Sequence, residues 1–214
     1  MTAKQPVPTH NRATTLAIGA AVWLTSIVTV LAWIGVYSNT PNAPGQPPEH
    51  WPAQSQISPD PDRPTLMMFV HPRCPCSRAS LDELARLLVQ ERGLGRTHLV
   101  FINPTGKSAA WAQTDLWRQA ARVPGLVVHL DQDGVEAQRF GVATSGQTLL
   151  YAASGALVFR GGITISRGYS GDNPGRTAVL DLLAHKVSPV VKTPTFGCPL
   201  FAVACAKGEA LCQP

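Results

Sequence analysis

From Thr65 onward the chain alternates short apolar runs with amphipathic segments, and this alternation limits the available folds more than any other feature. Apolar residues recur at helical spacing at Leu81, Leu84 and Leu88. Runs of strand length occupy residues 66–70, 97–102, 126–130, 148–152 and 156–160. Short apolar runs bounded by turn residues are typical of buried strands, and the helical spacing indicates an amphipathic helix. The pattern predicts the order β-α-β-α-β-α-β-β-α.

Turn and capping residues divide these elements. Asn173-Pro174 supplies an N-cap and a first-turn proline for a last helix through His185. Thr114 is expected to cap a helix that ends near Ala121, and Asp133-Gly134 begins a short one that ends at Phe140-Gly141. Ala153-Ser154-Gly155 is a hairpin signal between the last two strands. Together these elements predict a mixed α/β sheet flanked by helices.

Cys74-Pro75-Cys76 lies where the first strand meets the first helix. The free N–H groups and the positive dipole end of a helix favour thiolate over thiol. Arg73 and Arg78 add positive charge, and His71 adds more when it is protonated. The sequence therefore predicts a redox-active site with Cys74 as the nucleophile.

Only Pro75 separates the two thiols, which makes a local disulfide difficult. If both cysteines were helical, their side chains would diverge by about 200°. A bridge between Cys74 and Cys76 would then need a non-helical conformation, and strain would make it more oxidising. The alternative is that these thiols pair elsewhere in the chain.

The C-terminal segment supplies further cysteines, Cys198, Cys205 and Cys212, at a strict seven-residue spacing. The tail, residues 188–214, has two interpretations. It folds back so that one of its thiols resolves an intermediate on Cys74, or its cysteines form a structural disulfide. Cys198 is the stronger redox candidate because it stands in a Gly-Cys-Pro sequence.

Topology brings other polar segments to the edge of the sheet where Cys74 lies. The first hairpin strand should run antiparallel to the cysteine-bearing strand, so its start, at 145–147, falls at that edge. The loop 162–169 follows the second hairpin strand and falls there too, with Arg167 available to a thiolate.

The N-terminal part is apolar and uncharged. Leu16 to Tyr37 is a run of 22 residues without a charge, and a helix needs about 20 to cross a bilayer. The sequence predicts an uncleaved transmembrane anchor at 14–37, with a cleaved signal peptide as the alternative. Lys4 and Arg12 precede it, so residues 1–13 are expected in the cytoplasm. The remainder would lie on the periplasmic or extracellular side of the plasma (inner) membrane, where disulfides persist.

Residues 38–64 contain eight prolines and are expected to form an extended spacer. Trp51 and Ile57 either attach its end to the domain at 65–187 or are isolated apolar residues in a linker. The net charge of +5 is scattered, and no basic run alternates with aromatic residues. This distribution does not indicate nucleic-acid binding.

The predicted order, with cysteines directly after the first core strand, resembles the thioredoxin fold in its membrane-tethered, extracytoplasmic form. Three short stretches, residues 71–80, 161–168 and 197–200, resemble those of the anchored thioredoxin-like proteins called RedB. Two departures stand out against the thioredoxin pattern. Thioredoxins carry Cys-x-x-Cys, and they place a cis-proline where this chain has Gln147.

The leading hypothesis is a membrane-anchored thiol–disulfide oxidoreductase without a cofactor. Cys74 attacks, Cys76 or Cys198 resolves, and His71 and Arg73 favour the thiolate. Peroxide reduction is a variant, because it needs only one activated thiol.

Two other functions are compatible with the sequence. One is a protein that binds or delivers copper, because Cu(I) prefers thiolate ligands, with Cys74, Cys76 and His71 as ligands. The other is an inactive scaffold in a membrane redox complex. The expected partners are the membrane, through residues 14–37, and a protein thiol or disulfide or such a redox complex.

Overall fold

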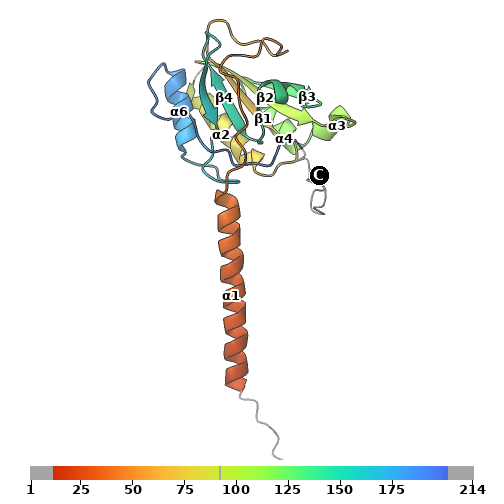
Figure 1. Ribbon diagram of the computed structural model, residues 1–214, viewed down its shortest axis with the longest axis vertical. Coiled ribbons are helices and arrows are strands. Elements are labelled where there is room, and N and C mark those ends of the chain that lie inside the picture. Colours follow the sequence, from red (N-terminus) through yellow and green to blue (C-terminus); the bar gives the residue numbers. More distant parts are fainter. Residues whose placement is uncertain (1–11, 92, 202–214) are drawn as a thin grey trace, which may run out of the picture. The chain divides into compact units, whose positions relative to one another are not determined.

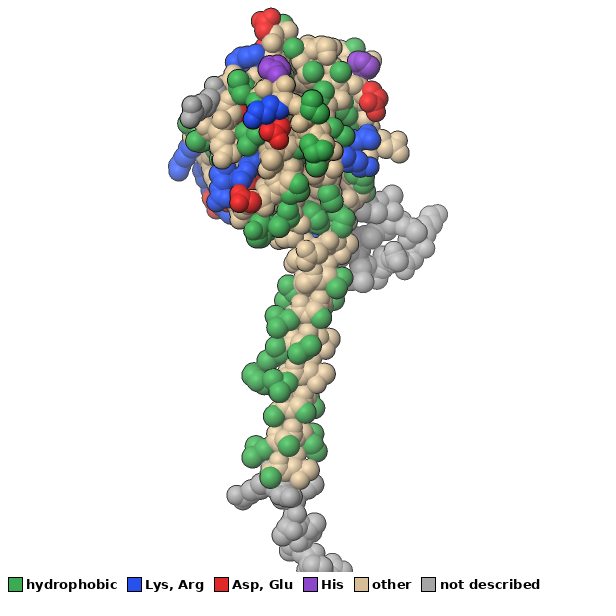
Figure 2. All heavy atoms as spheres, turned by 90° about the vertical axis from the view of Figure 1, so that its left-hand side faces the viewer, with side chains coloured by type: hydrophobic (Ala, Val, Ile, Leu, Met, Phe, Trp, Pro, Cys, Tyr) green, Lys and Arg blue, Asp and Glu red, His purple; other side chains and the backbone are tan. Residues whose placement is uncertain are grey.

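The computed structural model describes residues 12–91 and 93–201, which belong to two compact units, Met1–Ser38 and Asn39–Pro214. The first unit holds helix α1 (Arg12–Asn39). From Ala13 to Asn39 this helix is long and apolar enough to cross a membrane, and an 18-residue stretch of it has a mean hydropathy of 2.0. Hydrophobic side chains line it (Figure 2). A single membrane span and a signal sequence both have this length and composition.

The second unit is built on one five-stranded sheet in the order β3-β2-β1-β4-β5 (Figure 1). Its strands are β1 (Thr65–Val70), β2 (Arg96–Asn103), β3 (Leu126–Gln132), β4 (Gln147–Tyr151) and β5 (Leu157–Gly161). The central strand β1 runs parallel to β2 and antiparallel to β4, and β3 and β5 form the two edges. This arrangement confirms the predicted mixed α/β, thioredoxin-like fold.

Three helices cover one face of the sheet: α2 (Ser77–Glu91), α4 (Asp115–Ala120) and α6 (Pro174–Leu183). Alternate residues of β1 face them. Leu66 and Met68 pack against Leu84 and Leu87 of α2, and all four are completely buried. Because successive side chains of a strand point to opposite faces, Leu66 and Met68 lie on the face that α2 covers.

The other face has little helix to cover it. Besides the five-residue α5 (Val135–Arg139), it is covered by irregular chain that includes Ile57 and Leu200. Trp51 packs edge-on against Phe140, with ring centroids 5.0 Å apart. All six residues of β1 are buried, so both faces need cover. Of the two alternatives for Trp51 and Ile57, the structure supports attachment to the domain, because this part of the Pro-rich segment completes the core.

The chain after α6 also lies on the domain. Arg160 N–H of the edge strand β5 donates to Val191 C=O at 3.0 Å, and Thr193 N–H donates back to Arg160 C=O at 3.2 Å. Pairing of this kind covers backbone groups that an edge strand otherwise exposes. The following residues, 195–200, continue to the loop before β4, which is where the cysteines meet.

The predicted helix starts are correct, with one difference in detail. Asn173 caps α6, since its side chain accepts a hydrogen bond from Arg176 N–H. Thr114 stands at the start of α4 but does not cap it; its hydroxyl donates instead to Pro72 C=O at 3.0 Å. This bond ties α4 to the turn that carries Cys74. A four-residue helix, α3 (Ala109–Ala112), was not expected.

Candidate functional site

Cys74 lies in the turn between β1 and α2, with 4% of its surface exposed. Its N–H donates to His71 C=O at 3.1 Å, and its C=O accepts from Ser77 N–H at 3.1 Å. These bonds fold the backbone into the first turn of α2. The sulfur therefore sits at the positive end of the helix dipole, where an anion is favoured.

Cys198 comes from the far end of the chain and lies against Cys74. The two Sγ atoms are 3.1 Å apart, and Cys198 N–H points at Cys74 Sγ with an N–S distance of 3.4 Å. Both residues, like Cys76, are free thiols in the structure. A disulfide has an S–S length of about 2.0 Å, so the pair is placed for bond formation by a small movement.

The loop before β4 holds Cys198 in this position. Ser145 N–H donates to Cys198 C=O at 2.8 Å. Ser145 Oγ accepts from His71 N–H at 2.7 Å and shares a hydrogen bond with Ser77 Oγ at 2.6 Å. Ser145 thus fixes both cysteine-bearing segments to one another. The sequence places residues 145–147 at this edge, but nothing in it singles out Ser145 or Ser77.

The residue before Cys198 is clamped by two donors from distant segments. Arg167 Nη1 and Asn42 Nδ2 both donate to Gly197 C=O, each at 2.5 Å. A Cβ on Gly197 would lie 1.9 Å from Ser145 O, so no other residue fits there. Arg167 was expected at this edge, whereas Asn42, in the Pro-rich segment, was not anticipated.

The hydrogen bonds around Cys74 favour its ionised form. The thiol of Cys198 contributes most to lowering the pKa of Cys74, and the thiol of Cys76 and the hydroxyl of Ser77 contribute further. The pKa values of the two neighbouring thiols shift in the opposite direction. Their bonds to Cys74, together with burial, raise the pKa of Cys76 and of Cys198, against a smaller downward effect of Arg167. These shifts favour a thiolate at Cys74 and neutral thiols at Cys76 and Cys198.

His71 and Arg73 lie near the site but act differently from what the sequence suggests. Burial lowers the pKa of His71, so its imidazole is neutral at pH 7. The Arg73 guanidinium stacks over the Trp111 ring, 4.8 Å from its centroid. Neither residue is among the groups that most lower the pKa of Cys74. Thiol and hydroxyl donors, rather than these two side chains, favour the thiolate.

The copper site suggested by the sequence does not fit this geometry. His71 Nδ1 accepts the Arg73 N–H at 3.2 Å, and its ring packs edge-on against Trp111, with centroids 5.5 Å apart. Within residues 12–91 and 93–201, no group of three His, Cys, Asp or Glu side chains is arranged to hold a metal ion. Cys205 and Cys212 lie outside the described residues.

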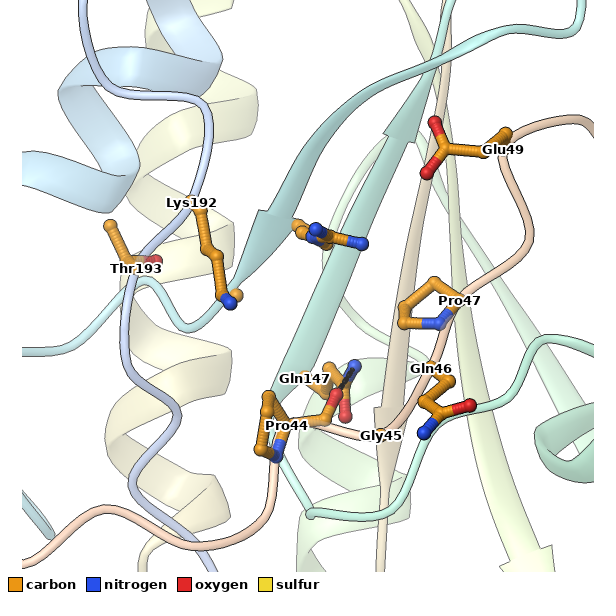
Figure 3. A pocket seen from close by; sticks show the side chains of 10 residues that line it. Pro44, Gly45, Gln46, Pro47, Glu49, Gln147, Lys192 and Thr193 are labelled. Atoms are coloured by element: carbon orange, nitrogen blue, oxygen red, sulfur yellow. Dashed lines mark hydrogen bonds between the residues drawn. The ribbon is translucent and has the colours of Figure 1, made fainter.

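A cavity of about 350 Å³ lies away from the cysteines. Its lining comes from the Pro-rich segment, β4, β5 and the chain after α6, and it includes Glu49, Gln147 and Lys192 (Figure 3). Gln147, which replaces the proline of thioredoxins, turns its amide toward Pro44 C=O and accepts from Ala143 N–H. The described residues contain no cis peptide bond.

Comparisons with solved structures agree with this fold. A hypothetical protein from Sinorhizobium meliloti is 23% identical with a TM-score of 0.53, and the match covers 78% of this chain and 98% of that one. An uncharacterized conserved protein from Geobacillus kaustophilus is 20% identical with a TM-score of 0.52, covering 68% and 80%. A pneumococcal exposed lipoprotein thioredoxin is more distant, at 18% identity, a TM-score of 0.42 and coverage of 57% and 84%.

No family model matches the chain, and no curated protein matches it either. The first two solved structures support the fold alone, and at this level of identity they assign no chemistry. The chemistry has to be argued from the cysteines themselves.

Proposed function

We propose that this protein is a thiol–disulfide oxidoreductase of thioredoxin-like fold, in which Cys74 is the nucleophile and Cys198 resolves the mixed disulfide. The contact between the two sulfur atoms, at 3.1 Å, is the observation that carries the proposal. It joins two residues 124 positions apart. Such a contact needs the whole C-terminal segment to be placed on the domain.

Each sulfur has the properties that its role requires. The thiolate, not the thiol, is the nucleophile, and the lowered pKa of Cys74 keeps it ionised. Cys198 has a raised pKa while Cys74 is a thiolate beside it. Once Cys74 carries a client sulfur, its negative charge is gone. Cys198 then loses its proton more easily and attacks Cys74.

Cys76 is better suited to support Cys74 than to pair with it. The neighbouring Cys74 and burial both raise the pKa of Cys76, so its thiol stays protonated while it helps to lower the pKa of Cys74. The one-residue spacing makes a Cys74–Cys76 disulfide strained. The proposed couple is therefore Cys74–Cys198, and Cys76 stabilises the reduced state. Peroxide reduction is a variant of the same chemistry.

The proposal includes a location. Helix α1, long and apolar enough for a membrane span, would anchor the chain through residues 14–37, with residues 1–13 in the cytoplasm and the domain in the periplasm or outside the cell. A Cys74–Cys198 disulfide persists in that compartment, because the enzymes that reduce disulfides in the cytosol are absent there. The partner would be a protein thiol or disulfide, or a membrane redox complex.

Reaction with glutathione disulfide tests this function. Reduced full-length protein in detergent should form a Cys74–Cys198 disulfide and release two equivalents of glutathione. Cys198→Ser should stop at a glutathione adduct on Cys74, and Cys74→Ser should not react at the site. Persistence of the reaction in Cys74→Ser would contradict the proposal. Copper titration of the same reduced protein tests the alternative, and tight binding that depends on His71 would favour it.

A further inference from the structure

Residues 195–200, called the tail strand below, form isolated bridges rather than a strand of the sheet. Backbone hydrogen bonds hold them beside Cys74. Ser145 N–H donates to Cys198 C=O, and Leu200 N–H donates to Ala143 C=O, both at 2.8 Å. On the other side Asn42 N–H donates to Thr195 C=O at 3.0 Å. Extended peptides bind proteins by main-chain bonds of this kind, whatever their side chains. The tail strand therefore occupies a site that can bind an extended peptide.

Side chains give this place a preference. Phe196 is 8% exposed and Leu200 is 4% exposed, so an apolar side chain is held two residues before and two residues after Cys198. The contact between Gly197 and Ser145 O excludes any side chain directly before the cysteine. The place fits an extended sequence of the form apolar–Gly–Cys–x–apolar.

The tail strand also stands between Cys74 and any large reactant. Cys74 is almost completely buried, and Cys198 Sγ lies directly against its sulfur. A disulfide within a protein cannot approach Cys74 along this path while Cys198 is there. If the tail strand moved away, Ser145 N–H, Ala143 C=O and the donors of Arg167 and Asn42 would be left for another chain to use.

We propose that the tail strand occupies the binding place of an extended, disulfide-bearing segment of a client protein, which displaces it during the reaction. This inference rests on the proposed function and adds its substrate class. The client segment pairs with residues 143–145 and presents its cysteine where Cys198 lies. The returning tail strand then expels the product, so that resolution and release are a single event.

The exchange balances without a further reactant. The Cys74 thiolate attacks one sulfur of the client disulfide. That S–S bond breaks, a mixed disulfide forms, and the second client sulfur leaves as a thiolate that takes a proton from water. Cys198 then gives its proton to water and attacks Cys74 Sγ, and the first client sulfur leaves and is protonated. The client disulfide is reduced to two thiols, and the protein gains the Cys74–Cys198 disulfide.

Two probes of different size test the inference on full-length protein in detergent. The protein carries Cys198→Ser, Cys205→Ser and Cys212→Ser, so the adduct on Cys74 accumulates. The small probe is 5,5′-dithiobis(2-nitrobenzoate). The large probe is the peptide Thr-Phe-Gly-Cys-Pro-Leu with thionitrobenzoate on its cysteine. The readout is the ratio of the two rate constants for adduct formation on Cys74, assigned by tandem mass spectrometry.

Loosening the tail strand should favour the large probe. Leu200→Asp places a carboxyl where an apolar side chain is buried, and Gly197→Val clashes with Ser145 O. Each should raise the peptide-to-small-probe ratio at least about fivefold, since a loss of about 1 kcal/mol in the hold on the tail strand suffices for that. Val187→Asp is the matched control: Val187 is 95% exposed and outside the tail strand, so the ratio should stay the same. A peptide with Val in place of its Gly should react about fivefold more slowly, a comparison that needs no folded variant.

The outcomes separate the inference from the function beneath it. Equal rates for the Gly and Val peptides, with a ratio unchanged by Leu200→Asp and Gly197→Val, refute the displaced strand and leave the function intact. A Cys74 that reacts with neither probe refutes the proposed function, and the inference with it.

Discussion

Replacing Cys198 with Ala should raise the pKa of Cys74. The largest downward influence on that pKa is the hydrogen bond from the Cys198 thiol, and Cys198 N–H adds a smaller one. Alanine removes the first and keeps the second. A hydrogen bond to a charged group contributes about 1.5–3 kcal/mol, and a pKa change of one unit corresponds to about 1.36 kcal/mol. The expected rise is therefore about 1–2 units, and Cys198→Ser, which keeps a donor, should show less.

The rate of alkylation by iodoacetamide as a function of pH measures this pKa, because only the thiolate reacts. Tandem mass spectrometry separates the Cys74 product from the Cys76 product. Val187→Ala, in the same part of the chain but highly exposed, should titrate like the wild type. An apparent pKa of Cys74 in Cys198→Ala that equals the wild-type value, or falls below it, would refute the claim that Cys198 holds the thiolate.

Three further predictions concern the scaffold, and urea unfolding followed by circular dichroism measures each. Glu83→Gln should cost about 3–5 kcal/mol, because Glu83 is fully buried against Arg176 at 2.5 Å; Asp115→Asn, in an exposed pair, should cost at most about 1 kcal/mol. Trp51→Ala should cost about 3 kcal/mol if the Pro-rich segment completes the core, and no change would mean that this segment is a free spacer. Burial lowers the pKa of His98 from 6.5 to about 4, so the stability due to its neutral form is present above pH 6.5 and is lost as the pH falls toward 4. His98→Leu should reduce that loss by up to about 3 kcal/mol, and identical pH profiles for the two proteins would contradict this.

Most of the fold could be predicted because every element except the four-residue α3 carries its own signal. Strand β1 is an unbroken apolar run, α2 has apolar residues at helical spacing, and Asn173-Pro174 marks the start of α6. These signals are local and can be recognised in short stretches of sequence. The order of strands and helices then limits the possible sheet topologies to a few. Strand directions then place residues 145–147 and the loop with Arg167 near Cys74.

The site could be predicted only in part, because its other half arises from contacts between distant residues. The sequence names Cys74 and Cys198 and leaves open whether they meet. Their contact depends on the close approach of Gly197 to Ser145 O and on the hydrogen bond that Asn42 donates to Gly197 C=O. The Pro-rich segment has the composition of a linker, yet one sheet face lacks helices, and Trp51 and Ile57 fill the gap. Amino-acid composition indicates how flexible an isolated segment is. It does not show that the segment packs on an uncovered face of the sheet.

The charges near Cys74 also depend on the folded chain. Arg73 and His71 are close to Cys74 in sequence, so their charges were expected to stabilise the thiolate. In the folded chain Arg73 stacks on Trp111, and His71 is neutral because it is buried. The pKa of Cys74 is lowered instead by the side chains of Cys198, Cys76 and Ser77. Their proximity to the sulfur in the folded chain cannot be judged from their distance along the sequence.

The disulfide connectivity of full-length protein, equilibrated in detergent with glutathione and mapped by mass spectrometry after alkylation of free thiols, tests the central claim most directly. The account predicts that a bond between Cys74 and Cys198 forms first as the potential rises, while Cys76 remains alkylatable. A first-formed bond between Cys74 and Cys76, or between Cys198 and another tail cysteine, would contradict it.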